Sequence, residues 1–403
     1  MGDRARVVRW VRALLLVELC AFVLSVAGTH GAFAPQPVPP TTTDFASFYS
    51  AGLLGDHGRA AEAYDQKVLL ATGRAAIHPG VTFNPFLNPP VFLLICAPLA
   101  ALPYLLAFVL FEAATALLWL GITTRIAGGG RLAAMALAAV PSVWWALGWG
   151  QNSFLSASLM GLGTLLLPRR PYLAGAAFGA LCFKPHFGIL IPVALLAARQ
   201  WRAIAGAAAS VVGLVSLTAV CFGTAIWPAF VNMALHARGT VESGKILFEG
   251  HVDAAGALRL LGVPAGPGWA VQAVVSLVAL ACVAWAWRRS PLIGGIRTQE
   301  DAAHHAVLCA ILVAGTLTAM PFILFYDLVM AGVAAAWLAR AARIGGWRPG
   351  EAAWLAILVA VDLVAFPAAS VLRLAVGMVV GPALLWLSMA RITRPIARSS
   401  VTK

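Results

Sequence analysis

Long runs of apolar residues, separated by short polar or basic segments, make up most of the chain. Each run is continuous rather than alternating, which favours helices over the strands of a membrane barrel. About 20 apolar residues are enough for one helix to cross a bilayer. The pattern therefore predicts about 12 transmembrane helices, at approximately residues 11–28, 89–124, 132–148, 153–167, 172–183, 187–198, 203–222, 268–287, 306–325, 328–339, 351–366 and 371–389.

Composition changes this picture from many helices to a protein embedded in lipid. Hydrophobic residues form 61% of the 403-residue chain and charged residues only 11%, whereas a soluble domain carries about 25% charged residues. So few charges cannot cover a surface that faces water. We therefore expect an all-α polytopic membrane protein, organised as one integral membrane domain over residues 1–403.

The basic residues predict an orientation. The net charge is +13, but the arginines gather between the apolar runs rather than on one polar face, which argues against nucleic acid as a partner. By the positive-inside rule, such clusters lie in the cytoplasm. Both termini are then cytoplasmic, in the plasma (inner) membrane, provided that residues 89–124 form one crossing broken at Pro98 or Pro103. The polar stretches at 29–88 and 223–267 become the two extracytoplasmic loops.

The first of these loops contains a second helical pattern. Phe45, Phe48, Tyr49 and Leu53 recur at helical spacing, which predicts an amphipathic helix lying on the outer face of the membrane. Asp44 stands at the start of this helix. Its carboxylate could cap the first turn, or it could carry chemistry at the outer face, and the local sequence leaves both roles open. Further along the loop, the pairs Asn84-Pro85 and Asn88-Pro89 indicate simple helix initiation.

Lys184 is the lysine that lies deep in apolar sequence, within Lys184-Pro185-His186. An ionisable residue inside a membrane segment is costly, so it indicates a functional site, here a cation that holds a lipid-linked phosphate. The alternative is a side chain that snorkels to the interface. Arg259 in the second loop is a further candidate for phosphate contacts, or else a solvated loop charge.

Other polar residues interrupt apolar runs at the predicted outer side. Gln151 and Asn152 could bond sugar hydroxyls or cap the helix that follows. Asp327 could likewise cap the next helix or line a cavity. No Asp-x-Asp pair occurs in the chain, and a single phosphate can be held by cationic side chains, so we expect neither a metal nor a cofactor.

Taken together and in order, several short motifs resemble glycosyltransferase family 87. The resemblance rests on the run 44–52, Ala63-Tyr64-Asp65, Asn88-Pro89-Pro90, Leu102-Pro103-Tyr104, Gly150-Gln151, Lys184-Pro185-His186 and Tyr326-Asp327-Leu328. It implies the GT-C membrane fold and extracytoplasmic glycosyl transfer from a polyprenyl-phosphate sugar, mannose in several members. It also implies that Asp44 matches the presumed catalytic base.

The predicted function is therefore transfer of a hexosyl group, mannosyl by this resemblance, to a hydroxyl of a glycolipid or glycan acceptor. Asp44 would act as general base, with inversion at the anomeric carbon. The candidates for binding the donor phosphate are Lys184, His186 and Arg259, and those for binding the substrate are Tyr49, Gln151, Asn152, Tyr326 and Asp327. A lipid-linked sugar transporter or flippase is the alternative, because it too would use a basic cavity and broken helices.

Overall fold

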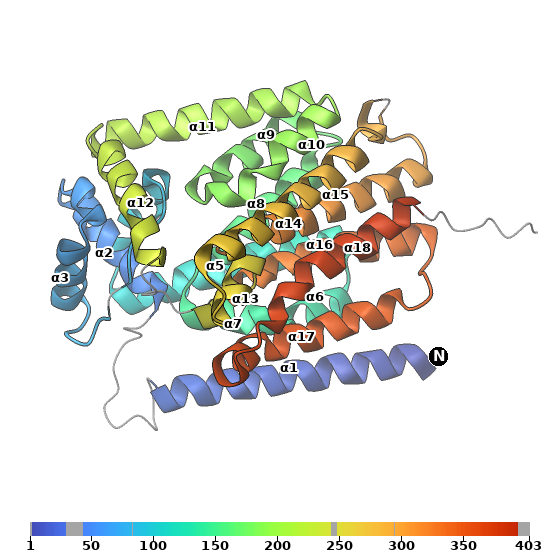
Figure 1. Ribbon diagram of the computed structural model, residues 1–403, viewed down its shortest axis with the longest axis horizontal. Helices are drawn as coiled ribbons and strands as arrows, with labels where there is room; N and C mark the ends of the chain where they lie inside the picture. The colour runs from blue at the N-terminus through green and yellow to red at the C-terminus, as the bar shows by residue number, and fades with distance from the viewer. Residues whose placement is uncertain (1, 30–42, 83, 243–247, 294, 394–403) are drawn as a thin grey trace, which may run out of the picture.

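The computed structural model describes residues 2–29, 43–82, 84–242, 248–293 and 295–393, and over these the chain is helical (Figure 1). Extended pairing within this part is limited to one antiparallel bridge, between His251 and Leu324. The prediction of an all-α fold is confirmed. Eight stretches are long and apolar enough to cross a membrane, and they contain α1 (Gly2–Thr29), α5 (Tyr104–Ile126), α11 (Trp201–Phe222), α14 (Ala265–Trp287), α15 (Gln299–Ala319), α16 (Val329–Gly345), α17 (Glu351–Leu372) and α18 (Val380–Thr393).

Two predicted helices are broken where proline interrupts the backbone bonding. The single helix expected over 132–148 is a pair, α6 (Arg131–Ala138) and α7 (Pro141–Trp149), bent by 59°, because Pro141 has no N–H to donate into α6. The long run at 89–124 divides into α4 (Leu93–Ala100) and α5. The division falls at Pro103, which precedes α5, whereas Pro98 lies inside α4 without ending it.

Three further apolar helices are too short for a full crossing: α8 (Ser153–Leu166), α9 (Pro171–Ala180) and α10 (Leu190–Ala197). The 14 residues of α8 rise about 21 Å, less than the roughly 30 Å of a hydrocarbon core. The eight long stretches and the bent pair give up to nine crossings within the described residues. A total of about twelve would require α8, α9 and α10 as well, so that number stays a prediction.

Burial separates a central helix from helices that face outward. In α15 every residue from His305 to Ala319 is buried, and the helix lies against α14, α16 and α18. The outer helices instead expose large apolar side chains, such as Leu24 of α1 (62% exposed), Val212 of α11 (65%) and Leu277 of α14 (64%). Apolar surface of this kind is stable against lipid tails rather than water. The structure therefore fits a multi-pass membrane protein.

The segments of the two predicted outer loops fold as helices, and α2, α3 and α12 lie together at one end of the molecule, opposite the N-terminus (Figure 1). The first loop contains α2 (Asp44–Asp56), the 3₁₀ helix η1 (Ala60–Tyr64) and α3 (Gln66–Ala76), with residues 30–42 outside the described part. The second contains α12 (Ile226–Glu242) and α13 (Ala254–Leu260).

The predicted amphipathic helix of the first loop is present as α2, but it is buried in the protein rather than exposed along one face. Nine of its residues are buried, on all sides of the helix. Gly52 comes so close to the carbonyl of Cys96 in α4 that a Cβ would collide with it. The predicted row of large apolar side chains is present on one face of α2. The other faces carry small residues such as Ala46 and Ala51, and these are buried too.

At the opposite end, arginine side chains bind the carboxyl ends of helices. Arg343 donates to the carbonyl of Ala127 (2.9 Å) and Arg340 to that of Ile126 (3.3 Å), both at the end of α5. A cation is favourable there because the helix macrodipole leaves partial negative charge on these carbonyls. Several of the basic residues between apolar runs thus meet at one end of the bundle.

Replacing Val212 with arginine tests whether α11 faces lipid. A charge near the middle of a lipid-facing helix costs about 2.5–3.5 kcal/mol in membrane insertion, although arginine is intrinsically a better helix former than valine. We expect Val212→Arg to lower the amount of folded protein in membranes several-fold. Ala75→Arg, at an exposed position of α3, is the control and should express normally. Equal expression of both variants would contradict a lipid-facing α11.

Candidate active site

The carboxylate of Asp44 is held by side chains from three other parts of the chain. Asn84 donates its Nδ2 to Oδ1 (2.5 Å), Gln151 donates its Nε2 to Oδ2, and the hydroxyl of Tyr326 lies 3.4 Å from the same Oδ2. Thr43, not Asp44, occupies the N-cap position of α2, and no side chain caps that helix. The capping alternative for Asp44 is therefore wrong.

A tight turn after α7 brings Gln151 to this carboxylate. Gly150 ends α7 with φ +65°, a left-handed conformation, and a Cβ there would lie 2.7 Å from Phe45 Cβ and from the Phe108 ring. Only glycine fits such a position without strain. Gln151 Nε2 also donates to the Tyr326 hydroxyl (3.1 Å), so one amide joins the carboxylate and the phenol.

Asn152 joins the same end of the molecule without capping α8. It occupies the N-cap position, but its side chain makes no capping bond. Its Nδ2 donates instead to Oδ1 of Asn88 (2.9 Å), and its own Oδ1 is buried with no hydrogen-bond partner among the described residues. Asn84 and Asn88, interpreted from sequence as helix initiation, are thus site residues that the sequence missed. The sequence feature that could have identified them is the pair of amide side chains within one polar loop.

Lys184 and Asp327 form a buried ion pair. Lys184 lies at the join of two 3₁₀ helices, η3 (Leu181–Phe183) and η4 (Pro185–Gly188). Its Nζ is 2.7 Å from Oδ1 of Asp327, and the two side chains are only 11% and 1% exposed. Lys184 therefore does not snorkel to the interface.

The carboxylate of Asp327 accepts hydrogen bonds on both of its oxygens. Ser153 donates its Oγ to Oδ1 (2.5 Å), and the backbone N–H of Leu324 donates to Oδ2 (3.3 Å). Asp327 thus caps the 3₁₀ helix η7 (Phe325–Leu328) and also pairs with Lys184. The capping role expected for Asp327 is thus seen at η7, its ion pair with Lys184 was not foreseen, and Ser153 is another residue that the sequence did not single out.

Two further candidates differ in their relation to this group. The imidazole of His186 lies close enough to Lys184 and Asp327 to interact electrostatically with both. Its Nε2 is buried without a hydrogen-bond partner among the described residues. Tyr49 donates its hydroxyl to the carbonyl of Leu102 (2.8 Å) and packs against Tyr104. The structure therefore brings His186 into the group and leaves Tyr49 in the packing between α2 and α5.

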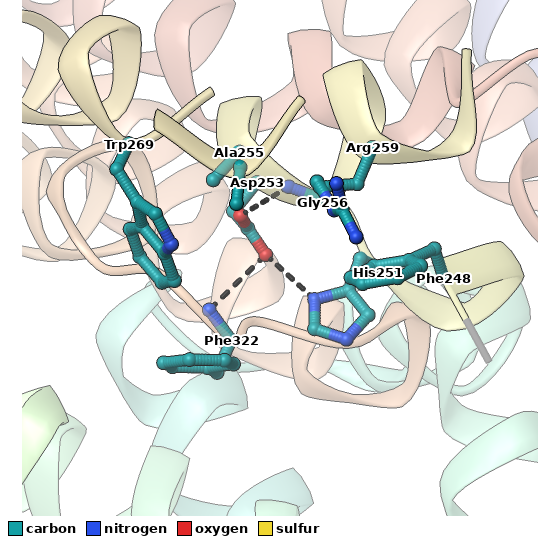
Figure 2. Close-up of a pocket in the computed structure, with 9 residues that line it drawn as sticks. Phe248, His251, Asp253, Ala255, Gly256, Arg259, Trp269 and Phe322 are labelled. Atoms are coloured by element: carbon teal, nitrogen blue, oxygen red, sulfur yellow. Dashed lines mark hydrogen bonds and ion pairs between the residues drawn. The ribbon is translucent and has the colours of Figure 1, made fainter. Parts of the chain in front are cut away.

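Arg259 lies in a different pocket, whose lining residues are drawn in Figure 2. It extends over the ring of Phe248 (5.2 Å to the centroid) and donates to the carbonyl of Val263 (3.3 Å). In the same pocket Asp253 accepts bonds from His251 Nδ1 (3.0 Å) and from the N–H of Phe322 (3.1 Å). Among the described residues, no hydrogen bond or ion pair joins this lining to Asp44 or Lys184, so the expected grouping of Arg259 with Lys184 is not seen.

The surroundings of Asp44 tune its acidity. Burial raises its pKa to about 6, although the hydrogen bond from Gln151, the charge of Lys184 and the bond from Tyr326 each favour the ionised form. A carboxylate with a pKa close to the operating pH is suited to accept a proton. Within the described residues, no three His, Cys, Asp or Glu side chains are placed to hold a metal ion.

Comparison with known protein families places the chain in one of them. The model of glycosyltransferase family 87 matches residues 86–312, which is more than half of the chain. The matched part contains Gln151, Asn152, Lys184 and His186, while Asp44 precedes it and Tyr326 follows it. No curated protein and no solved structure matches the chain.

A double-mutant cycle tests the buried ion pair. Lys184→Met or Asp327→Asn alone leaves a buried group without its partner, which costs about 3 kcal/mol or more. We expect the double variant to lose less stability than the two single variants lose together. The coupling should be about 1–3 kcal/mol, measured by unfolding in detergent. The exposed pair Arg59–Glu62, with side chains 52% and 42% exposed, is the control and should couple far more weakly, because water screens an exposed ion pair. Equal coupling in both cycles would contradict a buried pair.

Proposed function

The chain belongs to glycosyltransferase family 87 and is a membrane glycosyltransferase, and from this premise we propose the reaction that it catalyses. A hexosyl group, mannosyl by resemblance to the family, passes from a polyprenyl-phosphate sugar to a hydroxyl of a glycolipid or glycan acceptor. Asp44 is the general base, and Lys184 and His186 bind the donor phosphate.

One observation carries this proposal: two consecutive residues hold the base and the cation. The Tyr326 hydroxyl contacts Asp44, and the Asp327 carboxylate contacts Lys184. Adjacent residues along a chain lie about 3.8 Å apart at Cα, so a proton acceptor and a positive charge are fixed near one another. Glycosyl transfer from a phosphate needs both, one for the acceptor and the other for the leaving group.

The proposed step is a single displacement. The acceptor oxygen attacks the anomeric carbon, and its proton passes to the Asp44 carboxylate. The bond from the anomeric carbon to the phosphate oxygen breaks on the opposite face, and its electron pair leaves with the polyprenyl phosphate. Attack opposite the leaving group inverts the anomeric centre, by the geometry that also governs inverting glycosidases.

The charge that develops on the leaving phosphate needs a donor that is already in place. A lysine ammonium has three N–H donors, so Lys184 can keep its bond to Asp327 (2.7 Å) and offer another to phosphate. The Nε2 of His186, which has no hydrogen-bond partner among the described residues, would supply a second contact. Asp327 then acts as a positioning residue that aims Lys184. Arg259 has no part in this arrangement, because it lies in the other pocket.

A lipid-linked donor suits the position of the site. Asp44 and Lys184 lie where apolar helices end or break, and a lipid phosphate sits at such a boundary between hydrocarbon and water. By the positive-inside rule the arginine-rich end faces the cytoplasm. The Asp44 end, and with it the reaction, would then be on the extracytoplasmic side of the plasma membrane, with both termini in the cytoplasm.

Asp44→Asn tests the assigned base. The substitution keeps the size of the side chain but removes proton acceptance, and general bases contribute about 10²–10⁴-fold to rate. We expect transfer of labelled mannose from polyprenyl-phosphate-mannose, in membranes containing the variant, to fall by at least about 100-fold. Asp56→Asn, on the exposed end of the same helix, is the matched control and should retain activity.

Equal transfer by the wild type and Asp44→Asn would exclude Asp44 as the base. A lipid-linked sugar transporter would instead move labelled donor across the bilayer without forming a glycosidic product. Product analysis and flipping of the donor, measured in the same vesicles, separate these two activities.

The pH profile gives a second test. Asp44 must be ionised to accept a proton, and its pKa is about 6. We expect kcat/KM to fall about tenfold per pH unit below 6 and to level off above it. Gln151→Leu removes a hydrogen bond that lowers this pKa, so the acidic limb should move to higher pH. An acidic limb that stays in place or moves to lower pH would contradict the assignment.

A further inference from the structure

Three exposed arginines line one open pocket at the end of α9 far from Lys184. The lining residues are Arg169, Arg170, Pro171, Tyr172, Leu173 and Arg202. Arg170 immediately precedes α9, and the helical stretch that begins there ends next to Lys184. Fourteen positions at about 1.5 Å each place the two ends roughly 20 Å apart. This pocket is therefore separate from the site around Asp44.

Close packing of two parallel helices creates the pocket. A Cβ on Gly175 of α9 would collide with the backbone of Ala203 in α11, and one on Gly179 with the backbone of Ala207. Such contacts let two helix backbones approach closely, as small residues do in membrane proteins. Since the contacts advance in the same direction along both helices, the amino-terminal ends of α9 and α11 lie side by side. Arg170 and Arg202 are thereby brought together.

This arrangement concentrates positive charge without a counterion in the part of the chain that the structure describes. Helix amino-termini carry partial positive charge, so arginines there are unfavourable. Between Glu112 and Glu242 the sequence has no acidic residue. No side-chain hydrogen bond or ion pair of Arg169, Arg170 or Arg202 occurs among the described residues. Arg391, in contrast, has an acidic partner in Glu351.

The rim of the pocket is apolar and exposed. Of the lining residues, Tyr172 is 58% exposed and Leu173 52%, and Trp201, the neighbour of Arg202 along the chain, is 63% exposed. Tyrosine and tryptophan at helix ends are typical of the boundary between head groups and acyl chains. A ligand here therefore meets cations at its head and apolar side chains beside it. A free anion would use only the first of these features.

We propose that this pocket binds the phosphate of an anionic phospholipid, with the lipid chains against Tyr172, Leu173 and Trp201. Basic pockets between membrane helices hold phospholipid head groups in this way. Guanidinium groups suit the task because they bind phosphate oxygens in pairs. The bound lipid neutralises the two helix ends and holds α9 and α11 together. This site does not depend on the proposed transfer reaction.

The test compares lipid retention by purified full-length protein in detergent, using native mass spectrometry. The pocket variant is Arg169→Gln/Arg170→Gln/Arg202→Gln. The control is Arg131→Gln/Arg288→Gln/Arg297→Gln, which removes the same charge from exposed arginines outside the pocket. We expect wild type and control to retain phosphatidylglycerol in preference to phosphatidylcholine. The pocket variant should bind phosphatidylglycerol about 100-fold more weakly, from roughly 1 kcal/mol per arginine.

Three outcomes would overturn the proposal. One is retention of phosphatidylglycerol by the pocket variant at the wild-type level, and another is equal loss by the control. The third is binding of inorganic phosphate, seen as a stability shift that the pocket variant lacks, with no retained lipid, because the site would then be one for a free anion.

Unfolding temperatures distinguish a loss of lipid binding from a defect in folding. Without lipid, the pocket variant should unfold at the wild-type temperature or above, because it loses like charges next to two helix amino-termini. Added phosphatidylglycerol should raise the unfolding temperature of wild type and control, but not that of the pocket variant. A variant that unfolds at a lower temperature in the absence of lipid would show that the arginines support the fold itself, against the proposal.

Discussion

The buried carboxylate of Asp327 is the constraint on which the candidate site depends. A charge that is 1% exposed is unstable unless it is paired and hydrogen-bonded, and Asp327 meets this demand with Lys184, Ser153 and the backbone of Leu324. These partners fix η4, α8 and η7 relative to one another. Because Tyr326 precedes Asp327 in the same turn, its hydroxyl is also fixed, and Asp44 and Gln151 assemble around it.

Lipid imposes a second constraint on where such groups can occur. The outer helices present leucine and valine to their surroundings, while α15 is surrounded by protein over most of its length. Polar chemistry cannot lie on the outward surface, so it lies where helices end or break. Lys184 stands between two short helical segments, and Gln151 follows the left-handed turn at Gly150. The same breaks that shorten α8, α9 and α10 thus create room for ionisable side chains.

For the fold, the sequence was informative about class and less so about the path of the backbone. Apolar runs of about 20 residues predict helices that cross lipid; the helical fold was confirmed, and eight stretches of the described residues are long and apolar enough to cross. The predicted path of the backbone was wrong where one sequence feature is compatible with several structures. Pro98 and Pro103 lie in the same apolar run and the sequence does not distinguish them, but only Pro103 coincides with a break between helices. The stripe of α2 indicated a surface helix, while Gly52 and its small neighbours allow α4 to cover the other faces.

By itself, the sequence determined that the protein is helical and embedded in a membrane, because composition and hydrophobic period act locally. It also singled out Asp44, Gln151, Lys184 and Asp327, since polar residues that interrupt apolar runs are costly and therefore conspicuous. Only the tertiary structure decided which of them meet. Asn84 and Ser153 joined the group, while Tyr49 and Arg259 did not. Such contacts join residues 40 to 282 positions apart, and helix packing, which no local pattern encodes, sets them.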